Sequence, residues 1–133
     1  MSEENVDRFV ASADAFNQRD IAAFFSLFDP EVQFEPQQAA LQGTYIGHDG
    51  IMEWLTDLAE HYDPESGHIE LAEVRDLGDS VFATGTLRFA GKASGIETEV
   101  PIAIVARFRD GQMTYFKDFG SKDEALEAAG LSE

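Results

Sequence analysis

Arg107-Phe-Arg-Asp-Gly-Gln-Met-Thr-Tyr-Phe-Lys-Asp-Phe-Gly120 is the stretch that decides how this chain folds. Two apolar and aromatic runs flank Asp110-Gly111, a dipeptide that accepts the positive φ angles of a tight hairpin turn. The stretch therefore predicts a β-hairpin whose second strand covers residues 113–119. Asp118 is a carboxylate near the end of that aromatic strand, which makes it the leading chemical candidate in the sequence.

Further strands are expected on the amino-terminal side of the hairpin. Apolar alternation and turn residues predict a short strand at 31–35, ended by Pro36, and three longer strands at 69–77, 81–90 and 97–109. The apolar positions of the 69–77 segment change face part-way, which indicates a β-bulge.

Helical periodicity appears mainly in the first half of the chain. Apolar residues recur at helical spacing in residues 3–17, 21–28 and 48–62, and Asp20 is placed to cap the second of these helices. A last short helix is expected at 122–129, where Ser121 and Glu124 fit a capping box. Helices followed by long antiparallel strands predict an α+β fold, with a bent sheet wrapped around the N-terminal helices as a cone, in one domain covering residues 1–133.

The strand at 81–90 is apolar on both faces, and this bears on assembly. Val81, Ala83 and Leu87 alternate with Phe82, so neither face suits full exposure to water. One face is expected to pack on the helices and the other on a second copy, which predicts a homodimer through the sheet.

Composition excludes several function classes. Nine Lys and Arg against 26 Asp and Glu give a net charge of −17, which repels nucleic acids and anionic membranes and favours solubility. The chain has no cysteine, so disulfides and thiol chemistry are excluded. No signal peptide and no membrane-spanning run are recognised, so a cytoplasmic location is expected.

Several strings, together with this order of elements, resemble the SnoaL-like branch of the nuclear transport factor 2-like superfamily. The strings are Ala15–Ile21, Phe28–Val32, Gly43–Ile51, Arg107–Gly111 and Glu124–Leu131. The resemblance covers essentially the whole chain and implies the cone fold with an interior pocket. That fold hosts isomerases, epoxide hydrolases, dehydratases, polyketide cyclases and non-catalytic binders, so it does not choose a reaction.

Similarity to ketosteroid isomerase would place a general base at Glu35, directly before the proline that ends the first strand. The two oxyanion donors of that enzyme map to Ser12 and near Ile104, so neither is retained. An enolate would then lack its main electrostatic stabilisation, and steroid-type isomerisation is not expected.

Similarity to limonene epoxide hydrolase gives a comparable result. Its central Arg-x-Asp pair maps to Gly85 and Leu87 and is absent, whereas its third acid maps to Asp118. SnoaL-type polyketide cyclases use an acid and a base in the cavity, and Asp118 or Glu35 would suit those roles. Each carboxylate is also explained without any catalytic role, as a strand-end hydrogen-bond acceptor or a solvated charge.

The remaining candidates surround the expected pocket. His48, at the start of the third helix, has a side chain suited to proton transfer near neutral pH, although a helix start explains its context equally well. The side chains expected to line the pocket are Tyr45, Trp54, Leu87, Ile102, Ile104 and Phe116, all of which also suit a simple core. The histidine spacings match no metal motif, so no metal and no cofactor are expected.

The sequence therefore predicts a pocket protein for an apolar cyclic or polyketide-like ligand, with cofactor-free acid/base chemistry by Asp118, Glu35 or His48. The alternative is a non-catalytic ligand carrier, or a dimeric module whose cavity is filled by its own side chains. An open cavity of several hundred Å3 that contains Asp118 would favour a ligand site.

Overall fold

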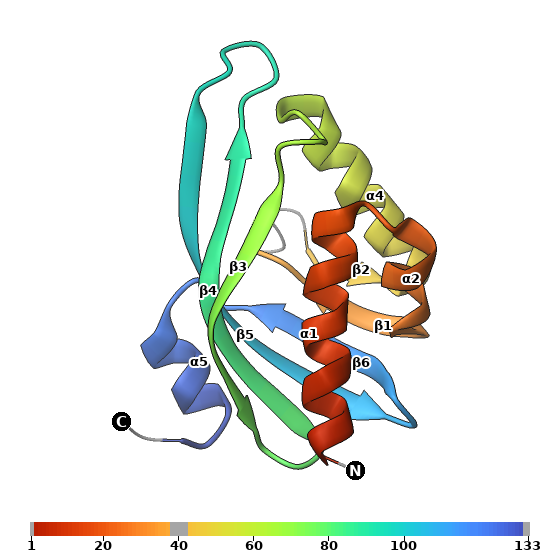
Figure 1. Cartoon of the computed structure of the whole chain (residues 1–133). Helices are drawn as coiled ribbons and strands as arrows, with labels where there is room; N and C mark the ends of the chain where they lie inside the picture. Colours follow the sequence, from red (N-terminus) through yellow and green to blue (C-terminus); the bar gives the residue numbers. More distant parts are fainter. Residues whose placement is uncertain (1, 38–42, 132–133) are drawn as a thin grey trace.

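A computed structural model describes residues 2–37 and 43–131 of the chain. Within these residues, six strands form one curled sheet in the order β2-β1-β6-β5-β4-β3 (Figure 1). The strands are β1 (Phe28–Glu35), β2 (Tyr45–Ile46), β3 (His68–Asp76), β4 (Ser80–Ala90), β5 (Glu97–Arg109) and β6 (Gln112–Asp118).

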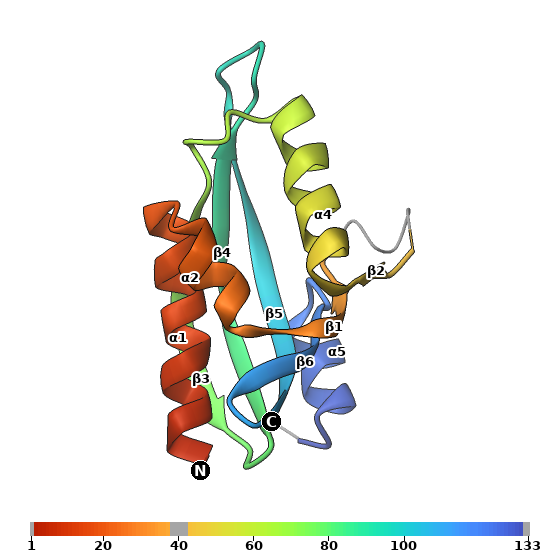
Figure 2. The same cartoon turned by 90° about the vertical axis from the view of Figure 1, so that its right-hand side faces the viewer.

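Helices lie on both sides of this sheet. They are α1 (Ser2–Gln18), α2 (Ile21–Ser26), α4 (Gly47–His61) and α5 (Lys122–Ala128). Figures 1 and 2 show α1 and α4 on one side of the sheet and α5 on the other. None of the helices in the described residues is long and apolar enough to cross a membrane.

The predicted caps and the predicted hairpin are confirmed. The Asp20 carboxylate accepts a hydrogen bond from the Ala23 N–H at the start of α2, and the Ser121 hydroxyl accepts one from the Glu124 N–H at the start of α5. Asp110 and Gly111 have φ angles of 52° and 83°, as a two-residue hairpin turn requires. The β3 register shifts between Leu71 and Glu73, which confirms the bulge.

The first strand differs from its prediction in extent and in pairing. β1 begins at Phe28 and includes Pro30, because Phe28 is 1% exposed and its burial outweighs the turn signal of Asp29-Pro30. β1 also runs parallel to β6, in contrast to the expected antiparallel sheet, and pairs with a short β2 that lies in a predicted loop. Residues 38–42 of that loop lie outside the described residues.

The core lies between the concave face of the sheet and helices α1, α2 and α4. Its least exposed large side chains include Phe28, Phe34, Ile51, Val81 and Met113. Phe34 packs on Trp54 and stacks on Phe116, at ring-centroid distances of 5.0 and 4.8 Å, so aromatic contacts tie α4 to the sheet.

A second, smaller core lies on the convex face. There, Ala125 and Leu126 of α5 pack against Phe82, Ala103 and Val105. The chain's own last helix therefore covers part of the convex apolar face of β4. A second copy of the chain is not needed to cover Phe82, which is fully buried.

Candidate ligand cavity around Asp118

Strand alternation places one set of apolar side chains inside the cone. On β4 and β5, Gly85 pairs with Ile102 and Leu87 pairs with Val100, so these residues share the concave face. Ile104 pairs with Asp118 of β6, which puts the carboxylate on the same face. Asp118 therefore faces the cone interior because of its register.

A cavity of about 270 Å3 lies between these side chains and α4. Its lining is almost entirely apolar and consists of Pro36, Gln37, Trp54, Ile69, Leu87, Phe89, Val100, Ile102, Ile104, Phe116 and Asp118. Of the six side chains expected to line a pocket, five do so, and the sixth, Tyr45, does not. The volume lies just below the range of about 300–1,000 Å3 that is usual for ligand pockets, so the cavity suits a small ligand.

Three hydrogen bonds hold the Asp118 carboxylate in place. Its Oδ1 accepts from the backbone N–H groups of Ala103 and Gly120, both at 3.0 Å. Its Oδ2 accepts from the Gln37 side-chain amide at 3.0 Å, and the same amide nitrogen donates to the Pro101 carbonyl at 2.9 Å. The carboxylate is thus fixed at the end of β6, with Gln37 bridging it to β5.

Burial raises the pKa of Asp118 above its ordinary value of 3.8. The three donors from Gln37, Ala103 and Gly120 oppose that rise, because they stabilise the ionised form. Desolvation is the larger effect, so Asp118 holds a proton more tightly than an exposed aspartate. A shift in this direction suits a group that exchanges a proton with a ligand near neutral pH.

Asp118 also borders the protein surface. A more open hollow of about 510 Å3 is lined by Glu35, Pro36, Gln37, Lys117, Asp118, Phe119 and Glu124. Pro36, Gln37 and Asp118 line both this hollow and the apolar cavity. The carboxylate therefore lies between the open hollow and the apolar cavity.

Glu35 does not join Asp118 in the apolar cavity. Its register partner is Lys117, which places it on the convex face with Gln33, whose partner is Tyr115. The Glu35 carboxylate accepts a hydrogen bond from Gln33 at 2.5 Å and lies 3.7 Å from the Lys117 ammonium. The cavity base expected from the isomerase resemblance therefore has no geometric support at this position.

His48 is likewise separate from the cavity. Its Nε2 is hydrogen-bonded to the Phe28 carbonyl at 2.8 Å, and its ring packs against Phe25 at a centroid distance of 5.3 Å. These contacts tie the start of α4 to the α2–β1 junction. This is the helix-start role that the local sequence equally favoured.

The positions of the isomerase oxyanion donors carry no free donor in the described structure. Ser12 is buried, and its hydroxyl donates to the Phe9 carbonyl at 2.6 Å. Tyr45, another hydroxyl near α4, donates to the Asp57 carboxylate at 3.2 Å and lies outside the cavity. Among the residues described, no group of three His, Asp or Glu side chains is arranged to hold a metal ion.

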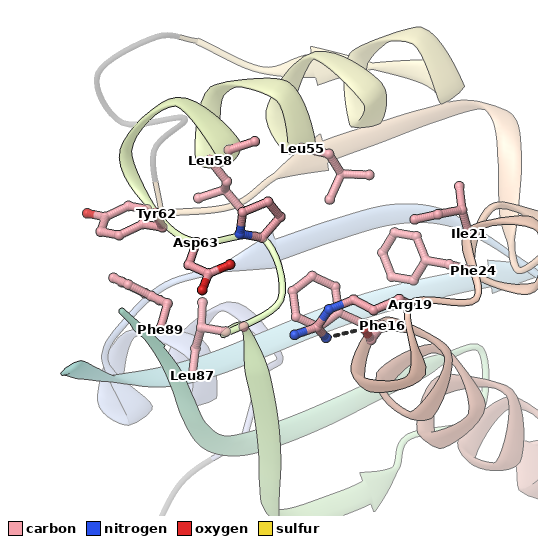
Figure 3. Close-up of a pocket in the computed structure, with 13 residues that line it drawn as sticks. Phe16, Arg19, Ile21, Phe24, Leu55, Leu58, Tyr62, Asp63, Leu87 and Phe89 are labelled. Carbon is pink, nitrogen blue, oxygen red and sulfur yellow. Dashed lines mark hydrogen bonds between the residues drawn. The ribbon is translucent and has the colours of Figure 1, made fainter. Parts of the chain in front are cut away.

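A second apolar cavity, of about 180 Å3, opens between the helices (Figure 3). Leu87 and Phe89 of β4 form a wall common to both cavities. The other walls come from α1, α2, α4 and the turn that follows α4, and Arg19 and Asp63 are its charged lining residues. The sequence analysis did not anticipate this cavity, because no local pattern shows which helix faces meet.

The sequence analysis also missed five lining residues of the Asp118 cavity, namely Pro36, Gln37, Ile69, Phe89 and Val100. Val100 and Phe89 continue the alternation of Ile102 and Leu87, so the strand period was a sufficient signal for them. Gln37 follows the proline that ends β1, and its bridge to Asp118 depends on the parallel pairing of β1 and β6. No local signal in the sequence marks it.

Comparison with solved structures finds the same fold in several proteins. An NTF2-like protein of unknown function from Burkholderia pseudomallei is 22% identical with a TM-score of 0.78, over 93% of this chain and 95% of that one. TerC, co-crystallised with polyporic acid, is 24% identical with a TM-score of 0.77, over 96% and 98%. A putative polyketide cyclase from Xanthomonas campestris is 18% identical with a TM-score of 0.69, over 96% and 97%.

Comparison with functionally curated proteins found no match. The family model described as the SnoaL-like domain matches residues 6–116, which include Gln37 and every lining residue of the Asp118 cavity except Asp118 itself. The chain therefore belongs to the SnoaL-like domain family and has its α+β, NTF2-like cone fold.

Proposed function

We propose that this protein binds a small apolar ring compound in the Asp118 cavity and that Asp118 exchanges a proton with it. The observation that carries the proposal is a desolvated, well-fixed carboxylate at the edge of an otherwise apolar cavity of about 270 Å3. A cavity with a few convergent polar groups and a titratable group of perturbed pKa is the usual form of a ligand site.

The lining supports a particular class of ligand. Trp54 and Phe116 offer flat aromatic surfaces, and Ile102, Ile104 and Leu87 offer aliphatic ones. Asp118 and Gln37 supply the carboxylate and the amide at one end. A compact ring ketone or phenol fits this distribution, with its ring among the apolar side chains and its oxygen near Gln37 and Asp118.

The reaction that this arrangement supports best is proton abstraction from the carbon next to a carbonyl. The ionised Asp118 takes the proton, the C–H electrons move into an enolate, and the same carboxyl group returns the proton to carbon. Gln37 is the amide beside Asp118, and it already donates to the Asp118 carboxylate and to the Pro101 carbonyl, so it must exchange one of these hydrogen bonds to donate to the enolate oxygen. TerC, with its bound polyporic acid, and the putative polyketide cyclase support a ring ligand only by analogy of fold.

Trp54 gives a direct assay, because it is the single tryptophan of the chain and lines the Asp118 cavity. Ring ketones such as 2-tetralone would be titrated against its fluorescence. In D2O, NMR would then follow exchange of the hydrogens next to the carbonyl. The expected result is saturable quenching of Trp54 and exchange faster than in buffer.

Two variants separate binding from chemistry. Asp118→Asn should keep the fluorescence titration and lose the exchange, whereas Glu35→Gln, on the other face of the sheet, should keep both. Exchange unaffected by Asp118→Asn would remove the role of this carboxylate. Failure of every ring compound to perturb Trp54 would contradict the binding site itself.

The competing function is a non-catalytic ligand carrier. The nearly unbroken apolar lining and the lack of a second acid in the cavity favour it. Tight, saturable binding with no proton exchange for any enolisable ligand would decide for the carrier.

A further inference from the structure

We infer that the second cavity is a binding site for an aromatic monocarboxylate, with its carboxylate on Arg19 and its ring between the helices. This site is distinct from the Asp118 cavity, and the inference does not depend on the proton chemistry proposed there.

The first observation is the state of the Arg19 guanidinium. One terminal nitrogen donates to the Phe16 and Asn17 carbonyls at 2.9 and 3.1 Å, at the end of α1. The Nε–H is buried and has no hydrogen-bond partner among the described residues. Buried polar groups are nearly always paired, so this unmet donor is an unusual feature of a side chain that lines the cavity, and a bound anion reaches the Nε–H when the guanidinium turns toward it.

The second observation is that Arg19 forms no ion pair with any carboxylate in residues 2–37 or 43–131. Most other cations of this acidic chain do form such pairs, for example Arg75 with Glu73 and Lys117 with Glu35. The exceptions, Lys92 and Arg107, are exposed, whereas Arg19 is half-buried. Its charge is therefore available to an incoming anion, and the planar guanidinium suits the two oxygens of a carboxylate.

The third observation is the backbone of Arg19. Its φ angle is 60°, a left-handed conformation that glycine or asparagine usually supplies after a helix. This conformation directs the side chain back across the Phe16 ring, with the guanidinium carbon 5.9 Å from the ring centroid. Figure 3 shows Arg19 extended over Phe16, with Asp63 and Tyr62 across the cavity from it.

The cavity itself selects the body of the ligand. Aromatic rings from four elements or turns line it, namely Phe16, Phe24, Tyr62 and Phe89. Its volume of about 180 Å3 suits a compact flat ring system better than a long chain. Ile21 is 45% exposed and Asp63 is exposed, so these residues mark the side that opens to solvent.

Asp63 is the charge that opposes an anion in this cavity. Its carboxylate accepts a hydrogen bond from the Glu65 N–H, which holds it in its own turn. A bound carboxylate must therefore lie at the Arg19 end. Removing the Asp63 charge should strengthen anion binding, a direction that a purely apolar site would not show.

The test is calorimetric titration of the full chain with 2-naphthoate and with its neutral counterpart 2-naphthamide. In the wild type, 2-naphthoate should bind about tenfold or more tightly than the amide. Arg19→Gln should remove that preference without weakening the amide, Arg19→Lys should retain part of it, and Asp63→Asn should tighten 2-naphthoate several-fold. The Arg19 Nε–H signal in a 1H–15N spectrum should shift as 2-naphthoate saturates the protein.

Val100→Phe is the control for the other cavity, because Val100 lines the Asp118 cavity and not the Arg19 cavity, and it should leave 2-naphthoate affinity unchanged. Equal affinity for the two ligands in the wild type would overturn the inference. So would loss of 2-naphthoate binding in Val100→Phe with no change in Arg19→Gln, since the ligand would then occupy the Asp118 cavity. If Arg19→Gln fails to fold, Asp63→Asn tests the site without it. An affinity for 2-naphthoate that Asp63→Asn leaves unchanged would then contradict the inference.

Discussion

Asp118 is the residue whose surroundings explain most about this protein. Its register opposite Ile104 turns it inward, its position at the end of β6 gives it two backbone donors, and Gln37 supplies a third. Desolvation raises the pKa of Asp118 and the three hydrogen bonds lower it, and the effect of desolvation is the larger one. The same residue is therefore a structural hydrogen-bond acceptor, and we propose that it also exchanges a proton with a ligand.

A raised pKa has a defined consequence for stability. The folded state binds the Asp118 proton more tightly than the unfolded state, so ionising this group destabilises the fold as pH rises from about 3.8 through the folded pKa. Asp118→Asn cannot ionise. The free energy of unfolding of this variant, relative to the wild type, should therefore increase over that window and level off above it.

Urea unfolding of both proteins between pH 4 and 7 measures this difference. Asp123→Asn, at an exposed position in the first turn of α5, is the control that makes the same substitution outside the cavity. A difference that falls as pH rises would show that the pKa of Asp118 is lowered by folding.

Gly85 allows a second residue-scale prediction. A Cβ atom there would lie 2.2 Å from the Glu70 carbonyl oxygen and 3.0 Å from the Leu71 Cα, both in the backbone of β3. Gly85→Ala should therefore destabilise the protein by about 1–3 kcal/mol, whereas Thr84→Ala, next to it, should cost less than about 1 kcal/mol. Thermal unfolding of the two variants checks this prediction. Equally small losses of stability would contradict it and would mean that the β3 backbone moves away at its bulge to make room for the Cβ atom.

The hairpin around Asp110-Gly111 and the two long strands β4 and β5 were predictable at the scale of single elements. Each is encoded locally, by a turn dipeptide or by unbroken alternation. The start of β1 was not predictable, because Asp29-Pro30 is a turn signal that core burial of Phe28 overrides. The same holds for the residues that line the cavity. Asp118 and Trp54 were predicted because they lie on elements that the local sequence encodes, whereas Gln37 lies outside such an element.

Helix α5 is the element whose role is most open to measurement. Leu126 is 3% exposed and packs with Ala125 on the convex face against Phe82 and Val105. Leu126→Ala should cost about 2–4 kcal/mol of unfolding free energy, because it leaves a cavity between helix and sheet. Glu127→Ala, on the exposed side of α5, should be nearly neutral, and an equal small effect for both would show that α5 adds little to the core.

At the scale of the whole molecule, long-range pairing decides where the site lies. The parallel contact of β1 with β6 brings Pro36 and Gln37 to Asp118, although more than 60 residues separate Glu35 and Lys117 along the chain. No turn signal encodes that pairing, so the sequence predicted the acid but not its partner. The helix-lined Arg19 cavity was missed for the same reason.

The assembly is a further whole-molecule prediction. We propose a homodimer through the part of the convex face that α5 leaves uncovered, where Thr84, Thr86 and Tyr115 are only half-buried. Light scattering at micromolar concentration should give twice the mass of 14.7 kDa. Thr86→Lys should shift the protein toward the monomer, with the same substitution at the exposed Thr56 of α4, Thr56→Lys, as the control, and a monomeric mass for the wild type would remove the proposal.

The most direct measurement of the central proposal is a crystal structure of the protein with the ring compound that titrates Trp54 most tightly. The predicted result is ligand density between Trp54, Phe116 and Ile102, with a ligand oxygen or acidic carbon next to the Asp118 carboxylate. An Asp118 cavity that stays empty at a concentration saturating the Trp54 signal, with the compound bound elsewhere, would contradict the account.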